Sequence, residues 1–195
     1  MRLARVGLVA VAALGLAGCG INDVPTKDEA VKAAWAEVQN QYQRRADLVP
    51  NLVETVKGYA RQEQTVFTDV TQARAAATSV KIDASTITDP AKFAEFQAAQ
   101  DRLTGALGRL LMVAENYPQL KSNENFLALQ SQLEGTENRI TVARRDYIQQ
   151  VQTYNLEFRN IPDKWVAGIF HGDSRPAETF KAAPEAQSAP KVSFQ

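Results

Sequence analysis

The chain has 195 residues, with 22 basic and 22 acidic side chains, one histidine and one cysteine. This length is enough for one domain with a hydrophobic core, and a single cysteine excludes a disulfide within the chain. The neutral balance and the lack of a basic tract exclude the electrostatic pattern of a nucleic-acid-binding protein. We therefore expect no nucleic-acid partner.

Residues 1–18 have the pattern of a secretory signal peptide. Arg2 and Arg5 precede an uncharged stretch, residues 6–17, which is shorter than the roughly 20 apolar residues that a membrane-spanning helix needs. The stretch ends in Leu16-Ala-Gly-Cys19, which resembles the bacterial lipobox: a leucine, two small residues and a cysteine whose thiol takes up a diacylglyceryl group. The sequence therefore predicts cleavage before the cysteine and lipid on its sulfur.

Lipid on Cys19 predicts a membrane-anchored protein that faces the periplasm, on a lipidated tether of residues 19–25. Gly20 is not the aspartate that retains many enterobacterial lipoproteins in the inner membrane, which favours the outer membrane over the inner. The alternatives are that Cys19 is a buried structural thiol or that the segment stays uncleaved.

The first helical segment is expected to begin at Thr26, because Thr26-Lys-Asp-Glu29 fits a capping box. Apolar residues then keep helical spacing from Val31 to Val80. Pro50 lies within this stripe, and proline removes a helical hydrogen bond. The stripe keeps its phase across Pro50, so we expect one long helix kinked there. The alternative is two helices, with Asp47 capping the second.

Two further long helices follow. Asp89-Pro90 is a good helix start, and Pro118 is expected to stop the helix that begins there, with residues 119–123 as a turn. Each helix carries a seven-residue apolar repeat, consisting of Phe96, Leu103, Leu110 and Tyr117 in one and of Phe126, Leu133, Ile140, Tyr147 and Tyr154 in the other.

Such repeats predict an all-α fold, an antiparallel bundle of long helices packed at shallow angles. We expect the bundle to occupy residues 26–170, with Pro162 ending the third helix and residues 165–170 forming a final short turn of helix. Residues 171–195 are rich in alanine, proline and serine, which predicts a disordered tail.

No catalytic constellation is visible. His171 is the only histidine and has no cysteine or second histidine to complete a zinc site, so we expect no metal and no cofactor. Polar residues beside the stripes are expected to form rim or interhelical contacts and solvated faces. They comprise Glu63, Glu115, Glu134, Glu137, Arg44, Arg45, Asp47, Lys57, Arg74, Arg139, Arg144 and Arg145.

The sequence resembles the LemA family over roughly residues 26 to 165. The resemblance rests on residues 44–60 (Arg-Arg-Ala-Asp-Leu-Val-Pro-Asn-Leu-Val-Glu-Thr-Val-Lys-Gly-Tyr-Ala), on residues 115–126, and on the segments around Glu134 to Asn155. Many members begin with an uncleaved transmembrane helix, whereas this chain has a lipobox. The resemblance implies a helical bundle on a membrane and no agreed activity.

These motifs supply candidate interaction or structural residues. They are Arg44, Asp47, Pro50, Asn51, Lys57, Gly58, Tyr59, Glu115, Tyr117, Pro118, Glu137, Asn138 and Arg139.

Three functional hypotheses follow. The first is a non-enzymatic interaction or scaffold module whose partners are membrane or envelope proteins, including a second copy of itself. The second is an enzyme or small-ligand binder with a polar pocket near Glu63, Arg74, Glu137 and Arg144. The third, a sensor of lipid or membrane stress, ranks last because the sequence shows no amphipathic face for a membrane surface.

Overall fold

The computed structural model describes residues 20–80, 83 and 85–181, and this part of the chain contains helices and no strand. Four helices build the body of the molecule: α2 (Asp23–Lys57), α3 (Gln64–Ser79), α4 (Pro90–Glu115) and α6 (Glu124–Leu156). Three short elements join or follow them: η1 (Thr86–Thr88), α5 (Pro118–Lys121) and α7 (Asp163–Phe170).

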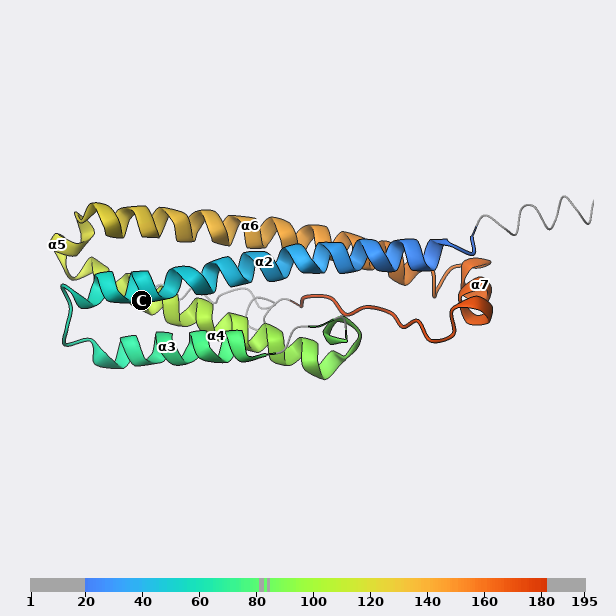
Figure 1. Ribbon diagram of the computed structural model, residues 1–195, viewed down its shortest axis with the longest axis horizontal. Helices are drawn as coiled ribbons and strands as arrows, with labels where there is room; N and C mark the ends of the chain where they lie inside the picture. Colours follow the sequence, from blue (N-terminus) through green and yellow to red (C-terminus); the bar gives the residue numbers. More distant parts are fainter. Residues whose placement is uncertain (1–19, 81–82, 84, 182–195) are drawn as a thin grey trace, which may run out of the picture.

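The four main helices form an elongated antiparallel bundle (Figure 1). The most extensive packing joins α2 to α6, followed by α3 to α4 and α2 to α3. The 35 residues of α2 span about 50 Å at 1.5 Å per residue. The start of α2 and α7 lie at one end of the bundle, and the α2–α3 connection and α5 lie at the other. The predicted all-α antiparallel bundle is therefore confirmed.

The apolar stripes meet in two hydrophobic clusters. The cluster nearer α5 contains side chains such as Leu52, Val56, Phe67, Leu103, Leu110, Phe126 and Leu133. The cluster nearer α7 is rich in aromatic residues and contains Val31, Trp35, Val38, Phe93, Phe96, Ile140, Tyr147 and Tyr154. Rings in the second cluster contact one another closely, and the centroids of Trp35 and Phe96 are 5.2 Å apart in an edge-on arrangement.

The first helix begins earlier than the capping-box prediction places it. It starts at Asp23, and the Thr26 hydroxyl donates a hydrogen bond to the carbonyl oxygen of Asn22 (2.7 Å). Burial of Val24 is the physical reason for the added turn, because this side chain is almost fully enclosed by the aromatic cluster. Pro25 is tolerated there because the first turn of a helix has no intrahelical partners for its N–H groups.

The long stripe is divided at Gly58 and not at Pro50. Helix α2 runs continuously through Pro50, as the first of our two interpretations predicts, but it ends at Lys57 and does not reach Val80. Residues 58–63 turn the chain into α3. Ala60 is completely buried within this turn, so the apolar spacing continues across a break that periodicity alone cannot reveal.

The other predicted helix starts hold with small changes, but the third long helix, α6, ends at Leu156 and not at Pro162, which instead precedes α7. The Asp89 carboxylate caps α4 by accepting hydrogen bonds from the backbone N–H groups of Ala91 and Lys92. Helix α4 ends at Glu115, and Pro118 begins the short helix α5 where we expected only a turn. The last element, α7, matches the expected final turn of helix and begins two residues earlier.

The predicted tail must be corrected for its first part, because residues 171–181 pack against the bundle. Asn155 makes two hydrogen bonds with the backbone of Ala177 (2.9 and 2.8 Å), and the Tyr147 hydroxyl donates to the carbonyl of Glu178 (2.8 Å). The ring of Phe180 enters the aromatic cluster, 5.0 Å from that of Phe93. Residues 182–195, the remainder of the predicted tail, lie outside the described residues.

Candidate functional site

A polar layer centred on Arg45 separates the two hydrophobic clusters. Arg45 is 1% exposed, and it lies one helical turn from Tyr42 in one cluster and from Val49 in the other. Its Nη2 donates to the side-chain Oε1 (2.7 Å) and the backbone carbonyl (3.2 Å) of Gln100 on α4. Its Nη1 donates to the Thr104 hydroxyl (2.8 Å) and to the Glu137 carboxylate on α6 (3.1 Å).

This layer joins three helices through one cation. The side chain of Glu137 is 39% exposed, so the ion pair reaches from the core to the bundle surface. The amide nitrogen of Gln100 in turn donates to the carbonyl of Ala77 on α3 (3.3 Å). A buried guanidinium with these partners specifies which helices pack together and how they are positioned along the bundle axis. A shift of one helix along this axis would leave a buried polar group without its partner.

A second polar contact compensates for Pro50. Proline has no N–H, so the carbonyl of Ala46, four residues earlier, loses its helical donor. Arg74 on α3 supplies the missing hydrogen bond, with its Nε 2.7 Å from the carbonyl oxygen of Ala46. Pro50, which lies in a segment that resembles the LemA family, therefore leaves a carbonyl on α2 without its helical donor. Arg74 of α3 donates a hydrogen bond to this carbonyl.

Three residues from the segments that resemble the LemA family, Tyr59, Tyr117 and Asn123, lie at the end of the bundle that carries α5. The Tyr59 hydroxyl accepts a hydrogen bond from Asn123 Nδ2 (2.9 Å). The Tyr117 hydroxyl donates to Glu63 (3.1 Å) and accepts from Gln62 (2.6 Å). These bonds join the α2–α3 connection to the segment between α4 and α6, although more than 50 residues separate the partners in sequence.

Tyr117 has an altered acidity within this group. Desolvation raises the pKa of its phenol, and the hydrogen bond to the Glu63 carboxylate raises that pKa further. Both effects favour the neutral hydroxyl, which is the form that donates to Glu63. The phenol therefore stays a neutral donor throughout the neutral pH range.

The remaining candidate residues on α2 and beside α5 lie on the surface, and three of them, Asp47, Lys57 and Glu115, have partners close in sequence. Arg44 and Asn51 are exposed, and the exposed Asp47 accepts a hydrogen bond from Gln43 in the same helix (2.8 Å). Lys57 pairs with Glu54 across the last turn of α2 (3.0 Å), and the next residue, Gly58, is the C-cap. Glu115 pairs with Lys121, and Pro118 is the first residue of α5.

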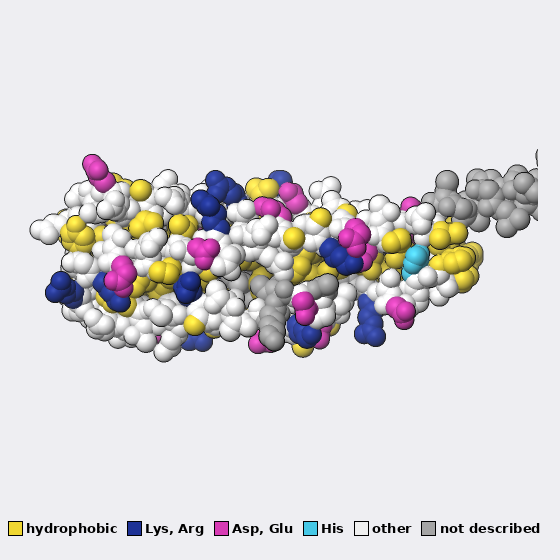
Figure 2. Space-filling view, in the orientation of Figure 1, with side chains coloured by type: hydrophobic (Ala, Val, Ile, Leu, Met, Phe, Trp, Pro, Cys, Tyr) yellow, Lys and Arg dark blue, Asp and Glu magenta, His cyan; other side chains and the backbone are white. Residues whose placement is uncertain are grey.

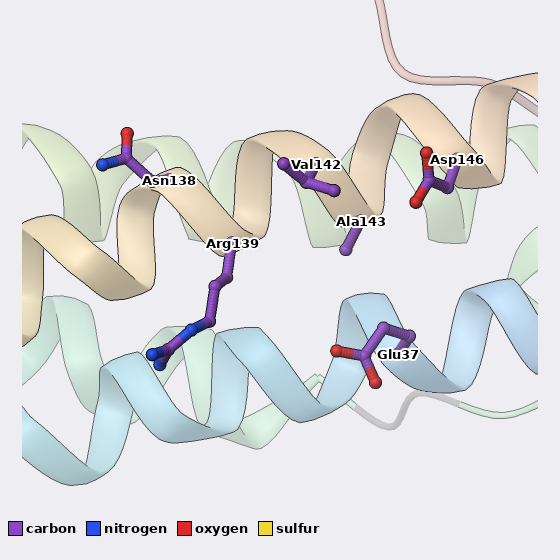
Figure 3. A pocket seen from close by; sticks show the side chains of 6 residues that line it. All are labelled: Glu37, Asn138, Arg139, Val142, Ala143 and Asp146. Atoms are coloured by element: carbon purple, nitrogen blue, oxygen red, sulfur yellow. The ribbon is translucent and has the colours of Figure 1, made fainter.

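Asn138 and Arg139 line a shallow hollow of about 320 Å³ between α6 and α2, together with Glu37, Val142, Ala143 and Asp146. Figure 3 shows that the Arg139 side chain extends from α6 towards α2, whereas Asn138 points away from the groove. No nucleophile with a neighbouring base lies among these residues. The hollow is thus an open groove between two helices with one cation and two carboxylates on its walls.

The polar pocket of our second hypothesis is not assembled. Its four residues have different partners in different parts of the bundle, since Glu63 accepts from Tyr117 and Arg74 donates to α2. Glu137 pairs with Arg45, and the guanidinium of Arg144 lies 4.2 Å from the ring centroid of Phe180. Within the residues that the structure describes, no group of three histidine, cysteine, aspartate or glutamate side chains is placed to hold a metal.

Sequence reasoning missed the contacts that close the opposite end of the bundle. Glu157 is 3% exposed and pairs with Lys27, and this hydrogen bond raises the pKa of the lysine. A ring nitrogen of His171 lies 2.7 Å from the carbonyl oxygen of Ile21. The pairing of a buried acid with a lysine 130 residues away leaves no local pattern in the sequence. Phe180, by contrast, is an aromatic residue among small and polar ones, which could have indicated that this segment packs against the bundle.

Together these features define a helical bundle protein whose polar contacts join helices and whose described residues include no helix long and apolar enough to cross a membrane. The LemA family model matches residues 34–194, most of the chain, so the protein belongs to the LemA family. The match continues past residue 170, where we expected the domain to end, and includes the packed segment 171–181.

Two curated relatives are the magnetosome proteins MamQ 1 and MamQ 2 of Paramagnetospirillum magneticum. Each is 26% identical to this chain over 180 residues, which cover 84% of this chain. The matched part spans 65% of each relative's length, slightly less than two thirds.

Proposed function

We propose that this LemA-family protein is a membrane-anchored lipoprotein that acts as a non-enzymatic interaction or scaffold module in the cell envelope. One observation carries the proposal: Tyr59, Tyr117 and Asn123, from the segments that resemble the LemA family, gather with Glu63 at one end of the bundle, and the start of α2 lies at the other. A lipid on Cys19 would hold the second end at a membrane and present the first end about 50 Å away.

The anchor rests on the sequence of residues 1–19, which lie outside the described part of the structure. A lipobox-like segment ends at Cys19, directly before the first described residue, and α2 begins four residues after it. Two or three acyl chains on one cysteine hold a protein on a bilayer far longer than a single chain does. The tether is so short that the bundle stays close to the membrane surface.

The partners that this arrangement favours are envelope proteins or a second copy of the chain. Export would place the bundle in the periplasm, and Gly20 after the cysteine favours the outer membrane. The magnetosome relatives align over only part of their length, so we do not extend a magnetosome role to this chain.

Site-specific photocrosslinking in intact cells tests the interaction module. A photoreactive residue at the exposed Gln119, on α5, is expected to yield one discrete crosslinked product in the membrane fraction. The same residue at the exposed Glu95, on the side of α4, is the matched control and is expected to yield none. Identical patterns at both positions, or no product at Gln119, would contradict a partner at the α5 end.

A further inference from the structure

Helix α7 and Ile161, two residues before it, carry an unpartnered apolar surface. Ile161 is 67% exposed, Trp165 60%, Ile169 76% and Phe170 58%. Ala167, by contrast, is buried against the bundle. Figure 2 shows the hydrophobic side chains gathered at this end of the molecule, beside the single histidine. We call Ile161, Trp165, Ile169 and Phe170 the α7 patch.

This surface differs from the other exposed apolar residues of the described chain. Tyr59, Met112, Leu127, Val142 and Leu156 occur singly along different segments, as is normal for a soluble surface. The α7 patch places four large side chains within ten residues, and clustered exposure of this kind marks a contact surface. Helix α7 lies at the end of the bundle opposite α5. The α7 patch and the α5 end therefore face different binding partners.

The start of the described chain lies directly beside the patch. The residue after Phe170 is His171, whose ring nitrogen lies 2.7 Å from the carbonyl of Ile21. Ile21 follows Cys19 by two residues, and Lys27 near the start of α2 pairs with Glu157 near the end of α6. These contacts place Ile21, two residues after Cys19, next to the α7 patch.

The chemistry of the patch fits a lipid surface. Tryptophan is enriched at the boundary between headgroups and acyl chains, and Ile and Phe partition below it. The neighbouring Lys164 is exposed and its aliphatic stem allows the ammonium to stay in the headgroup layer. The eight residues of α7 bury too little apolar area to hold a protein on a membrane alone. Next to an acyl anchor, however, the helix is already at the bilayer, so its insertion carries no further entropic cost of bringing protein and membrane together.

We propose that α7 lies in the membrane interface with Trp165, Ile169 and Phe170 inserted among the lipids beside the acylated Cys19. This inference rests on the proposed anchor and extends it from a single lipid attachment to a two-point attachment. Two points fix the orientation of the bundle, which directs the α5 end away from the bilayer. No amphipathic membrane face is visible in the sequence because α7 is short, and because only the tertiary structure shows which of its residues stay uncovered.

The two tryptophans of the chain provide the test, because Trp35 is buried in the bundle and Trp165 is exposed. The full lipidated protein is reconstituted in phosphatidylcholine vesicles whose acyl chains carry bromine near the headgroup. Bromine is expected to quench about half of the total tryptophan emission, from Trp165 at the interface. The Trp165→Phe variant, which keeps the apolar surface, is expected to show little quenching.

A second variant and an aqueous quencher separate the alternatives. Ile169→Ser combined with Phe170→Ser is expected to reduce bromine quenching of Trp165 while the protein stays on the vesicles through Cys19. If the anchored protein shows Trp165 quenched by acrylamide and not by bromine, α7 is in water and the inference is wrong. Protection from both quenchers would mean that another protein surface covers the patch, which also overturns it. Loss of the protein from the vesicles would overturn the anchor and, with it, this inference.

Discussion

Replacing Arg45 by methionine tests whether the polar layer specifies the bundle. Methionine replaces the aliphatic stem of arginine but ends near the position of Nε, so the terminal part of the guanidinium is lost and the Oε1 atom of the buried Gln100 loses its donor at 2.7 Å. An unsatisfied buried acceptor costs about 1–3 kcal/mol. The loss of the bonds to Thr104 and Glu137 adds little to this cost, because both side chains can bond to water instead. We expect Arg45→Met to lower the free energy of unfolding by about 2–3 kcal/mol.

Thermal unfolding of the full chain in mild detergent, followed by far-UV circular dichroism, measures this effect. The expected loss corresponds to a melting temperature lower by roughly 5–10 °C for a domain of this size. Arg44→Met is the matched control, because Arg44 is the exposed neighbour on the same helix, and it is expected to change stability by no more than about 0.5 kcal/mol. Equal effects of the two variants would refute the structural role assigned to Arg45.

A double variant shows whether the orphaned acceptor is the cause. Gln100→Leu removes that acceptor, so Arg45→Met with Gln100→Leu is expected to be more stable than the sum of the single effects by about 1 kcal/mol. Strict additivity would mean that the cost of Arg45→Met comes from lost packing and not from Gln100.

Three further outcomes are expected. Arg74→Met should cost about 1 kcal/mol of unfolding free energy, and less in a Pro50→Ala background, where the alanine N–H can donate to Ala46 in place of Arg74. Phe180→Ala should accelerate hydrogen exchange in residues 172–181 while the four main helices stay protected, because its ring joins that segment to the aromatic cluster. Tyr147→Phe should make stability decline less steeply above pH 10, as followed by melting temperature against pH.

The sign of the Tyr147 prediction follows from its pKa. Burial, together with the nearby Glu178 carboxylate, raises the phenol pKa above its ordinary value of 10.0, so the folded state favours the neutral form. This contribution is fully present below pH 10 and is lost as the pH rises through the pKa of the folded state. If the stability of Tyr147→Phe declines above pH 10 as steeply as that of the wild type, ionisation of Tyr147 is not the cause of the loss of stability at alkaline pH.

Matched controls exist for the other two variants. Arg109→Met removes an exposed arginine from α4 and is expected to show no coupling to Pro50→Ala. Arg175→Ala changes an exposed residue of the packed segment and is expected to leave its hydrogen exchange unchanged. If Pro50→Ala leaves the cost of Arg74→Met unaltered, the hydrogen bond to Ala46 is not the source of that cost. Unchanged exchange in Phe180→Ala would mean that hydrogen bonds alone hold the segment.

Local rules predicted the parts of the fold that local chemistry determines. Asp89 caps α4 because its carboxylate reaches the first free N–H groups, and this depends on three neighbouring residues only. The seven-residue repeats predicted the bundle because an apolar stripe must be covered by another helix. Both features are visible in a single sequence without knowledge of the partners.

Features that depend on distant partners were not predictable in the same way. Pro50 is tolerated within a helix because Arg74, 24 residues later, donates a hydrogen bond to the Ala46 carbonyl, which has no helical donor at Pro50. Arg44 and Arg45 are adjacent and identical in type, yet only Arg45 enters the core, where Gln100 and Glu137 receive it. The packed segment 171–181 lacks any periodicity, since its burial depends on Phe180 and on backbone bonds to α6.

The N-terminus of the membrane-bound protein is the most direct test of the lipid anchor on which the proposed function depends. Mass spectrometry of the protein purified from the membrane fraction is expected to show an N-terminal Cys19 that carries diacylglycerol, with residues 1–18 absent. Cys19→Ser is expected to abolish both the added mass and the cleavage. A peptide that continues from Gly18 through an unmodified Cys19 to Gly20 would contradict the account.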